Sequence, residues 1–305
     1  FTGNTVIGTG ELERIAGPYT GRTISSEELL QLRDKLTLRY VESGYISSGA
    51  VIPDQEVAGG VIRVRIVEGR LSEIEVSGLE HLDPDYVTRR IDPETEAPLN
   101  IQSLQSRLLV LQQAPAIDRL NAELAPSHRP GESVLRVAVT EAAPAFGAIG
   151  ASNDQPVSTG STQGWIALGS RNLTGSADSL SFAAGATEGA ENFNLGYTVP
   201  LNRHDTTLGL LYDQTSGSVV EEPFDVLDIE SKTVNYGATL THPFLRTPNR
   251  QLSMGLGIHF RTNETKILGV SFPFVPGAQD GVTDVTVLRF SQEWVGRERD
   301  RVIAA

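Results

Sequence analysis

Cysteine is absent from the 305-residue chain, and methionine occurs only once. The lack of cysteine excludes disulfide scaffolds, thiolate metal sites and cysteine nucleophiles. No run approaches the roughly 18 consecutive apolar residues that indicate a transmembrane helix. Basic residues are outnumbered, 25 against 38 acidic ones, which gives a net charge of −13. We therefore expect no nucleic-acid partner, because a phosphate backbone requires clustered Lys and Arg.

Motifs of catalysis and of cofactor binding are missing as well. The five histidines have no metal-ligand spacing, and neither a G-x-S-x-G nucleophile motif nor a G-x-x-x-x-G-K phosphate loop occurs. Gly8 and Gly10 form a G-x-G without a third glycine, which we interpret as a loop before a helix. The sequence therefore predicts no enzyme, no catalytic residue, no cofactor and no metal site. The chain begins with Phe1 and shows no signal peptide, and we interpret it as a fragment or a processed form.

The first 70 residues combine helical and strand patterns. Ser25, which precedes Ser26 and two glutamates, has the features of a helix N-cap. Apolar residues then recur at helical spacing as far as Tyr40, and Gly44 ends the run. Residues 61–67 alternate between apolar residues and two arginines, which predicts a strand with one exposed face.

The same order of patterns follows a second time. Asp83 and Pro84 predict the start of a short helix, Asn100 is expected to cap another, and strands are expected at 117–124 and 133–139. Residues 1–70 and 71–141 are thus each predicted to form strand, helix, helix, strand, strand (β-α-α-β-β). An internal repeat of about 70 residues is too long for the common solenoids.

From Ala145 onward the helical patterns disappear. Apolar residues alternate with small or polar ones in five runs, within residues 179–186, 193–199, 207–213, 234–240 and 252–261. Weaker strands are expected at 145–152, 162–170 and 285–294, which makes about eight strands. This alternation, with short connections between long ones, is typical of antiparallel transmembrane β-barrels. A soluble β-sandwich also alternates, although the polar positions hold Gly, Ser, Thr and Asn rather than the Lys and Glu of a solvated face.

Several short sequences carry a family resemblance. They are FTGNTV at 1–6, PYTGRTIS at 18–25, GYISSGAVIPDQ at 44–55, VEG at 67–69 and VSG at 76–78. Together they resemble the first polypeptide-transport-associated (POTRA) domain of two-partner secretion transporters, the haemolysin-activation and filamentous-adhesin exporters. Residues 71–143 resemble the second POTRA domain of that family. GSRNLTGSAD at 169–178 and YTVPL at 197–201 resemble its first periplasmic turn and the strand end that follows.

The resemblance implies a fold class and a division into domains. It implies two α+β POTRA domains, at 1–70 and 71–143, followed by the N-terminal part of an antiparallel transmembrane β-barrel at 144–305. That last part holds about eight of the sixteen strands that the family's barrel has. The family's plug helix and its long inward-folding loop have no counterpart in the sequence, so we interpret the chain as a piece of a transporter.

The resemblance also implies a function. Such a transporter lies in the bacterial outer membrane, with residues 1–143 in the periplasm. It recognises an unfolded, haemolysin- or adhesin-like exoprotein in extended form and secretes it through the barrel, so the expected partners are this client and outer-membrane lipid. Alternatives are an outer-membrane protein assembly or insertion factor of the same superfamily, a soluble surface adhesin, and an enzyme attached to a barrel.

An exposed sheet edge can bind an extended client strand through main-chain hydrogen bonds. In a β-α-α-β-β repeat, the helix–helix insertion leaves one of the later strands at the edge. The residues expected there are Ser47, Ser48, Gly49, Ala50, Val51 and Ile52 in the first repeat, and Ile117, Asp118, Arg119 and Leu120 in the second. The alternative is that these edges only pack against the neighbouring domain.

Overall fold

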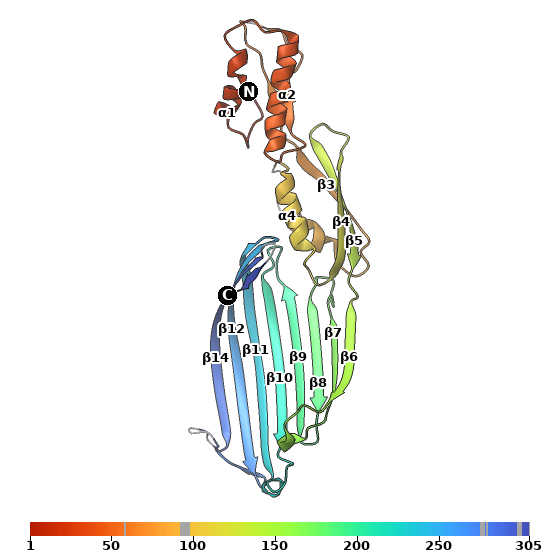
Figure 1. Cartoon of the computed structure of the whole chain (residues 1–305), viewed down its shortest axis with the longest axis vertical. Coiled ribbons are helices and arrows are strands. Elements are labelled where there is room, and N and C mark those ends of the chain that lie inside the picture. Colours follow the sequence, from red (N-terminus) through yellow and green to blue (C-terminus); the bar gives the residue numbers. More distant parts are fainter. Residues whose placement is uncertain (58, 92–97, 275–277, 279, 298–300, 305) are drawn as a thin grey trace. The chain divides into compact units, whose positions relative to one another are not determined.

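The computed structural model describes residues 1–57, 59–91, 98–274, 278, 280–297 and 301–304. The chain divides into two compact units, and Figure 1 labels helices and strands of both. The first unit comprises Phe1–Gly78, Val87–Gln113 and Arg119–Thr140, and the second comprises Leu79–Tyr86, Ala114–Asp118 and Glu141–Ala305. No helix in the described part of the chain is long and apolar enough to span a membrane.

The first repeat is built around two helices. Its elements are α1 (Thr9–Ala16), a 3₁₀ turn η1 (Gly17–Tyr19), α2 (Ser26–Glu42), β1 (Gly49–Val51) and β2 (Arg65–Val67). The predicted start of α2 is confirmed: the Ser25 side chain accepts from the Glu28 amide, and the Glu28 carboxylate accepts from the Ser25 amide. The core between these elements contains Leu12, Leu36, Tyr40 and Ile66.

The strand predicted at 61–67 is shorter than expected. Only residues 65–67 pair with β1, while Thr2 forms a single parallel bridge to Arg65. The side chain of Gln55 accounts for the difference, because its Nε2 donates to the Arg63 carbonyl at 2.9 Å and its Oε1 accepts from the Arg63 amide at 2.8 Å. Both backbone groups that a partner strand would use at Arg63 are therefore already bonded.

The second repeat has the predicted β-α-α-β-β order. It consists of β3 (Arg70–Ser77), α3 (Pro84–Ile91), α4 (Ile101–Leu111), β4 (Ile117–Pro126) and β5 (Glu132–Glu141). These strands form a sheet in the order β3-β5-β4, with β3 parallel to β5. Asn100 caps α4 as predicted, since its Oδ1 accepts from the amides of Gln102 and Ser103.

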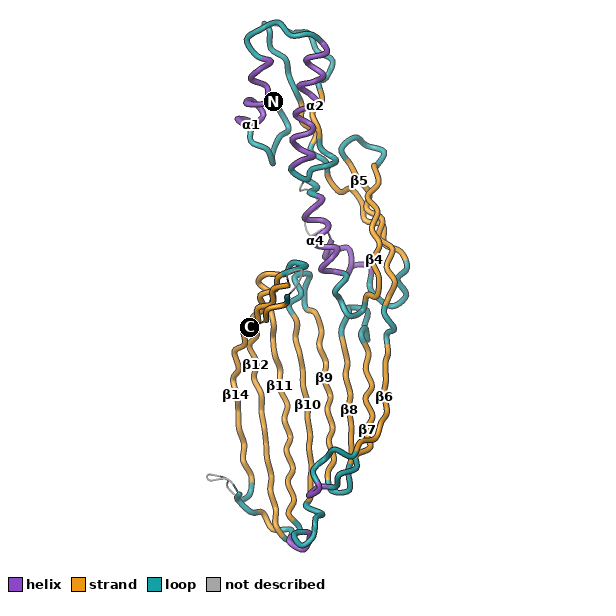
Figure 2. The backbone as a smooth tube through the Cα atoms, in the orientation of Figure 1, coloured by secondary structure: helices purple, strands orange, loops and turns teal. Residues whose placement is uncertain are grey.

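The rest of the second unit is one large antiparallel sheet (Figure 2). Its order is β15-β14-β12-β11-β10-β9-β8-β7-β6, with the short β13 beside β12. The strands are β6 (Ala145–Ser152), β7 (Gln163–Ser170), β8 (Ser179–Ala186), β9 (Ala190–Pro200), β10 (Thr207–Ser218), β11 (Ile229–Arg246), β12 (Arg250–Ile267), β13 (Val270–Ser271), β14 (Val282–Arg297) and β15 (Val302–Ala304). Short 3₁₀ turns, η2 (Val157–Thr159) and η3 (Asp225–Leu227), lie in two connections.

All eight predicted barrel strands are present. The structure extends β11 and β12 to 18 residues each, beyond the predicted runs. The added pairs, from Ile229 with Ile267 to Thr233 with Asn263, are rich in polar residues, so these ends show no apolar alternation that the sequence analysis could detect. Within the described residues β6 and β15 are the two ends of the sheet order.

Candidate functional site

The expected edge in the first repeat centres on β1. Ser48 is buried, with 4% of its surface exposed, and its Oγ accepts from the Gly69 amide at 2.8 Å. The Ala50 amide donates to Oγ1 of Thr37 on α2 at 3.1 Å. Because successive amides of a strand point to opposite sides, the amide of Val51 then points toward β2. The central donor on the outer side of this three-residue edge is thus already bonded to α2.

The expected edge in the second repeat is longer. Ile117, Asp118, Arg119 and Leu120 form the first part of β4, which continues to Pro126. In the described part of the sheet β4 lies at the margin, next to β5. Ile117 is buried and its amide bonds to the Ala114 carbonyl, whereas most of the following side chains are exposed. The ten-residue β4 therefore offers a much longer edge than the three-residue β1.

The structure places the two expected segments in different sheets, one in each repeat. The strand predicted at 117–124 covers most of β4, but the segment expected to bind the client stopped at Leu120, whereas the strand runs on to Pro126, which cannot donate to a ladder. It also missed the role of Thr37. No sequence signal identifies that contact, because Thr37 simply occupies a half-buried position in a helix.

A carboxylate organises the first repeat. Glu68 accepts hydrogen bonds from the amides of Thr5 at 2.6 Å and Val6 at 3.0 Å, and from the hydroxyl of Tyr40 at 3.0 Å. Partial burial acts to raise the pKa of Glu68, but the hydrogen bonds from Thr5, Val6 and Tyr40 outweigh it and lower the pKa. Glu68, in the VEG sequence at 67–69, therefore binds the FTGNTV sequence at 1–6 and Tyr40 of α2.

The second repeat contains the equivalent carboxylate. Glu141 accepts from the amides of Glu80 at 2.9 Å, His81 at 3.0 Å and Leu82 at 2.8 Å. Burial acts to raise the pKa of Glu141, but these backbone hydrogen bonds and a contact from the His81 ring lower it. Each repeat therefore uses a glutamate at or directly after the end of its last strand to bind backbone amides of the segment that precedes its first helix.

A glycine accompanies the carboxylate in both repeats. Gly3 has a φ of 83°, and a Cβ added there would lie 2.4 Å from the Ile66 carbonyl oxygen. Gly78 has a φ of 81°, and its added Cβ would lie 2.3 Å from the Val139 carbonyl oxygen. Glu68 and Glu141 follow those two carbonyls at the same spacing. The internal repeat is thus confirmed at the level of individual contacts.

A third carboxylate holds the turn between β7 and β8. Asp178 is fully buried and accepts from the amides of Leu173 at 3.1 Å and Thr174 at 2.8 Å, and from the Tyr197 hydroxyl at 2.9 Å. These bonds lower the pKa of Asp178 even though burial acts to raise it. Within the same unit, the Asp83 amide donates to the Gly175 carbonyl at 2.8 Å. The turn that resembles the family's first periplasmic turn is therefore stabilised by Asp178 within it and by the backbone of Asp83.

The large sheet has two faces of different chemistry. On one face Asn194, Asp213 and Asn235 lie opposite one another on three neighbouring strands, and Asp213 accepts from both amide groups. The adjacent row on the other face runs through Leu195, Tyr212, Tyr236 and Phe260, with the last two rings stacked at 5.2 Å. The alternation in the sequence therefore becomes one polar and one apolar face.

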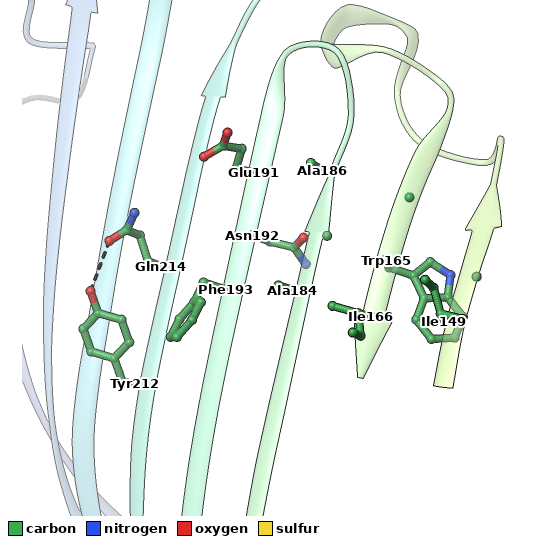
Figure 3. Close-up of a pocket in the computed structure, with 13 residues that line it drawn as sticks. Ile149, Trp165, Ile166, Ala184, Ala186, Glu191, Asn192, Phe193, Tyr212 and Gln214 are labelled. Atoms are coloured by element: carbon green, nitrogen blue, oxygen red, sulfur yellow. Dashed lines mark hydrogen bonds between the residues drawn. The ribbon is translucent and has the colours of Figure 1, made fainter. Parts of the chain in front are cut away.

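Each face contains a hollow. The larger, of about 830 Å³, is lined on the apolar face by the cross-strand row Ile149, Ile166, Ala184 and Phe193, with Tyr212 beside it (Figure 3). The polar face has a hollow of about 490 Å³ whose lining includes His259, Arg261 and Arg289. Among the described residues no group of three His, Cys, Asp or Glu side chains could hold a metal ion.

Comparison with known proteins gives two family matches. Residues 1–69 match the ShlB-type POTRA domain, and residues 131–274 match the haemolysin secretion/activation protein ShlB/FhaC/HecB. The outer membrane transporter CdiB of Dickeya dadantii is 27% identical over 222 residues, covering 70% of this chain and 38% of CdiB. The heme/hemopexin transporter protein HuxB of Haemophilus influenzae is 25% identical over 260 residues, covering 82% of this chain and 45% of HuxB.

The solved structure of CdiB from Escherichia coli has the same fold. It superposes with a TM-score of 0.68 at 21% identity and covers 98% of this chain and 55% of that structure. The chain thus spans less than half the length of the curated relatives it matches. The expected fold, POTRA structure followed by the strands of a partial, unclosed barrel, is confirmed, and the two matched segments resemble the ShlB-type POTRA domain and the ShlB/FhaC/HecB family that the sequence motifs indicated.

Proposed function

We propose that this chain is the part of a transporter that captures an unfolded exoprotein in extended form and begins its passage across the outer membrane. The observation that carries this proposal is the ten-residue edge strand β4, which is combined with a large sheet whose one face is polar. The relatives and the family model are transporters, which supports this proposal over an enzymatic role.

Capture at β4 would use the backbone of both partners. Main-chain hydrogen bonds from a sheet edge accept strands of varied sequence, since side chains contribute only at alternate positions. Each such bond contributes a net ~0.5–1.5 kcal/mol, so several bonds are needed for useful affinity. Asp118 to Leu124 can offer several; the shorter segment Ser47 to Ile52 offers fewer, because the Ala50 amide is bonded to Thr37.

Passage would follow the polar face of the large sheet. That face presents small and polar residues. Ser181 of β8 is paired with Gly196 of β9, and Asn194 of β9 lies in the next row of the same face. Side chains of this kind bury little apolar surface, so an extended chain moving past them gains little from any one contact. The opposite, apolar face is suited to outer-membrane lipid.

Site-specific photo-crosslinking tests the capture step. A photoreactive amino acid replaces Ala122, an exposed residue of β4, in the protein at its natural length and in cells that secrete the client. We expect a covalent adduct with the client at this position. Leu109, an exposed residue of α4 in the same repeat, is the matched control and should give little adduct. Equal adduct at both positions, or none at Ala122 while secretion continues, would show that β4 is not the capture edge.

A further inference from the structure

Asn100 connects the two repeats through both ends of its side-chain amide. Its Oδ1 caps α4 by accepting from the amides of Gln102 at 3.0 Å and Ser103 at 3.2 Å. Its Nδ2 donates to the carbonyl of Ser43, the C-cap of α2, at 3.0 Å. The side chain therefore bonds to the start of α4 in the second repeat and to the end of α2 in the first repeat. All these residues belong to the first unit.

Backbone bonds surround this side chain. The Ile101 amide donates to the Gly44 carbonyl at 2.9 Å, and the Leu99 amide donates to the Gly69 carbonyl at 2.7 Å. Gly44 has a φ of 89°, and a Cβ added there would lie 3.0 Å from the Asn100 Nδ2. The partly negative C-terminus of α2 therefore faces the partly positive N-terminus of α4, an arrangement that is electrostatically favourable.

The other helix cap shows that capping alone does not require an amide. Ser25 occupies the matching position before α2, and its hydroxyl satisfies the Glu28 amide without reaching another repeat. Asp and Ser are as common at this position as Asn. A carboxylate has no donor, and a serine hydroxyl accepts and donates through one short atom, whereas the Asn100 amide accepts from the α4 backbone with Oδ1 and donates to a carbonyl with Nδ2. The donor half of Asn100 therefore has a role separate from capping.

We propose that Asn100 is a positioning residue that holds the two POTRA repeats in one fixed orientation, with its Nδ2 as the contact that joins them. The orientation itself does not depend on the proposed function. The consequence of a fixed orientation does depend on the proposed function. With β4 and β1 at a constant distance from each other, the two edges could bind one extended client chain together.

Distance measurement between spin labels tests the orientation directly. The chain has no cysteine, so Gln31→Cys on α2 and Gln105→Cys on α4, both exposed, place one label on each repeat of the protein at its natural length. In Asn100→Asp the carboxylate still caps α4, but it has no donor for Ser43 and instead repels that carbonyl. We expect the single narrow distance population to shift or to split into two. Asn100→Ser, which caps but is too short to reach Ser43, should do the same.

Two controls separate positioning from stability. Ser25→Ala removes a cap without touching the contact between the repeats, and it should leave the distance population unchanged. Acidification should restore the narrow population in Asn100→Asp, because the protonated carboxyl regains a donor, whereas Asn100→Ser should not respond. An unchanged distance population in both Asn100 variants would overturn the proposal. Since this readout involves no client, its failure is distinguishable from a failure of the proposed capture at β4.

Discussion

The two POTRA repeats share one plan and differ at the edge where a client would bind. Both repeats fold as two helices over a small sheet, and both place a glycine and a glutamate in the same contacts, Gly3 with Glu68 and Gly78 with Glu141. The edge strand is three residues long in the first repeat and ten in the second. The contacts that maintain the fold are thus alike in the two repeats, whereas the length of the available edge differs.

The difference between the edges has a simple physical origin. In the first repeat Thr37 lies on α2, next to β1, and its hydroxyl accepts a hydrogen bond from the Ala50 amide. The second repeat extends its edge strand to Pro126, and β5 provides a full-length partner on the other side. The proposed capture of a client would therefore depend mainly on the second repeat, with a smaller contribution from the first.

The largest effect is expected at the shared glycines. Gly78→Ala places a Cβ 2.3 Å from the Val139 carbonyl at a positive φ, which should lower the free energy of unfolding of that repeat by roughly 2–4 kcal/mol. Gly3→Ala should do the same in the first repeat. Pulse proteolysis in increasing urea measures both changes.

A control glycine separates collision from backbone strain. Gly59 also has a positive φ, but an added Cβ there meets nothing within 4 Å. Gly59→Ala should therefore cost only about 1 kcal/mol. If Gly78→Ala were as mild as Gly59→Ala, the close approach to Val139 would not constrain the fold, and the two repeats would not be equivalent at this point.

Next in size is the carboxylate of the second repeat. Glu141→Gln keeps the shape but replaces the charged acceptor of three amides, and we expect a loss of about 1–3 kcal/mol at neutral pH. Since the folded-state pKa of Glu141 is lowered, its contribution is present above the unfolded-state pKa and is lost as pH falls through the folded-state pKa. Stability of the variant should therefore depend less on pH in the acidic range than stability of the parent.

Glu68→Gln is the matching change in the first repeat. Its carboxylate binds two amides and the Tyr40 hydroxyl, and its pKa is lowered as well, so the acid dependence should weaken in the same direction. Denaturant unfolding at a series of pH values gives both comparisons. An acid dependence unchanged by both substitutions would assign the acid sensitivity of the repeats to other groups.

Much of this organisation could be predicted from the sequence. Helix starts at Ser25, Asp83 and Asn100 depend on local capping chemistry, which a few neighbouring residues determine. The strands of the large sheet follow from alternation, because one face is apolar along most of its length. The family resemblance supplied the order of domains and the expected function.

The remaining features depend on contacts between distant residues. Gln55 shortens a predicted strand by forming hydrogen bonds with the backbone of Arg63. The Thr37 hydroxyl accepts a hydrogen bond from the amide of Ala50, 13 positions away. Asn100 reaches Ser43 across 57 positions. Local patterns carry no information about such partners, so the length and availability of an edge could be determined only from the folded chain.

The smallest effect, and the sharpest test of the difference between the edges, is expected at Thr37. Thr37→Val keeps the shape of the side chain but removes the hydroxyl that accepts from Ala50 and donates to Arg33. The loss of these bonds should cost about 0.5–1.5 kcal/mol of unfolding free energy, while the Ala50 amide becomes available at the edge. A photoreactive amino acid at the exposed Val51 should therefore give more client adduct in Thr37→Val than in the parent.

Ser26→Ala, on the same helix but remote from β1 in sequence, is the control. If the adduct at Val51 does not increase although the repeat stays folded, the bonded amide is not what limits the first edge, and its short length alone explains the difference from β4.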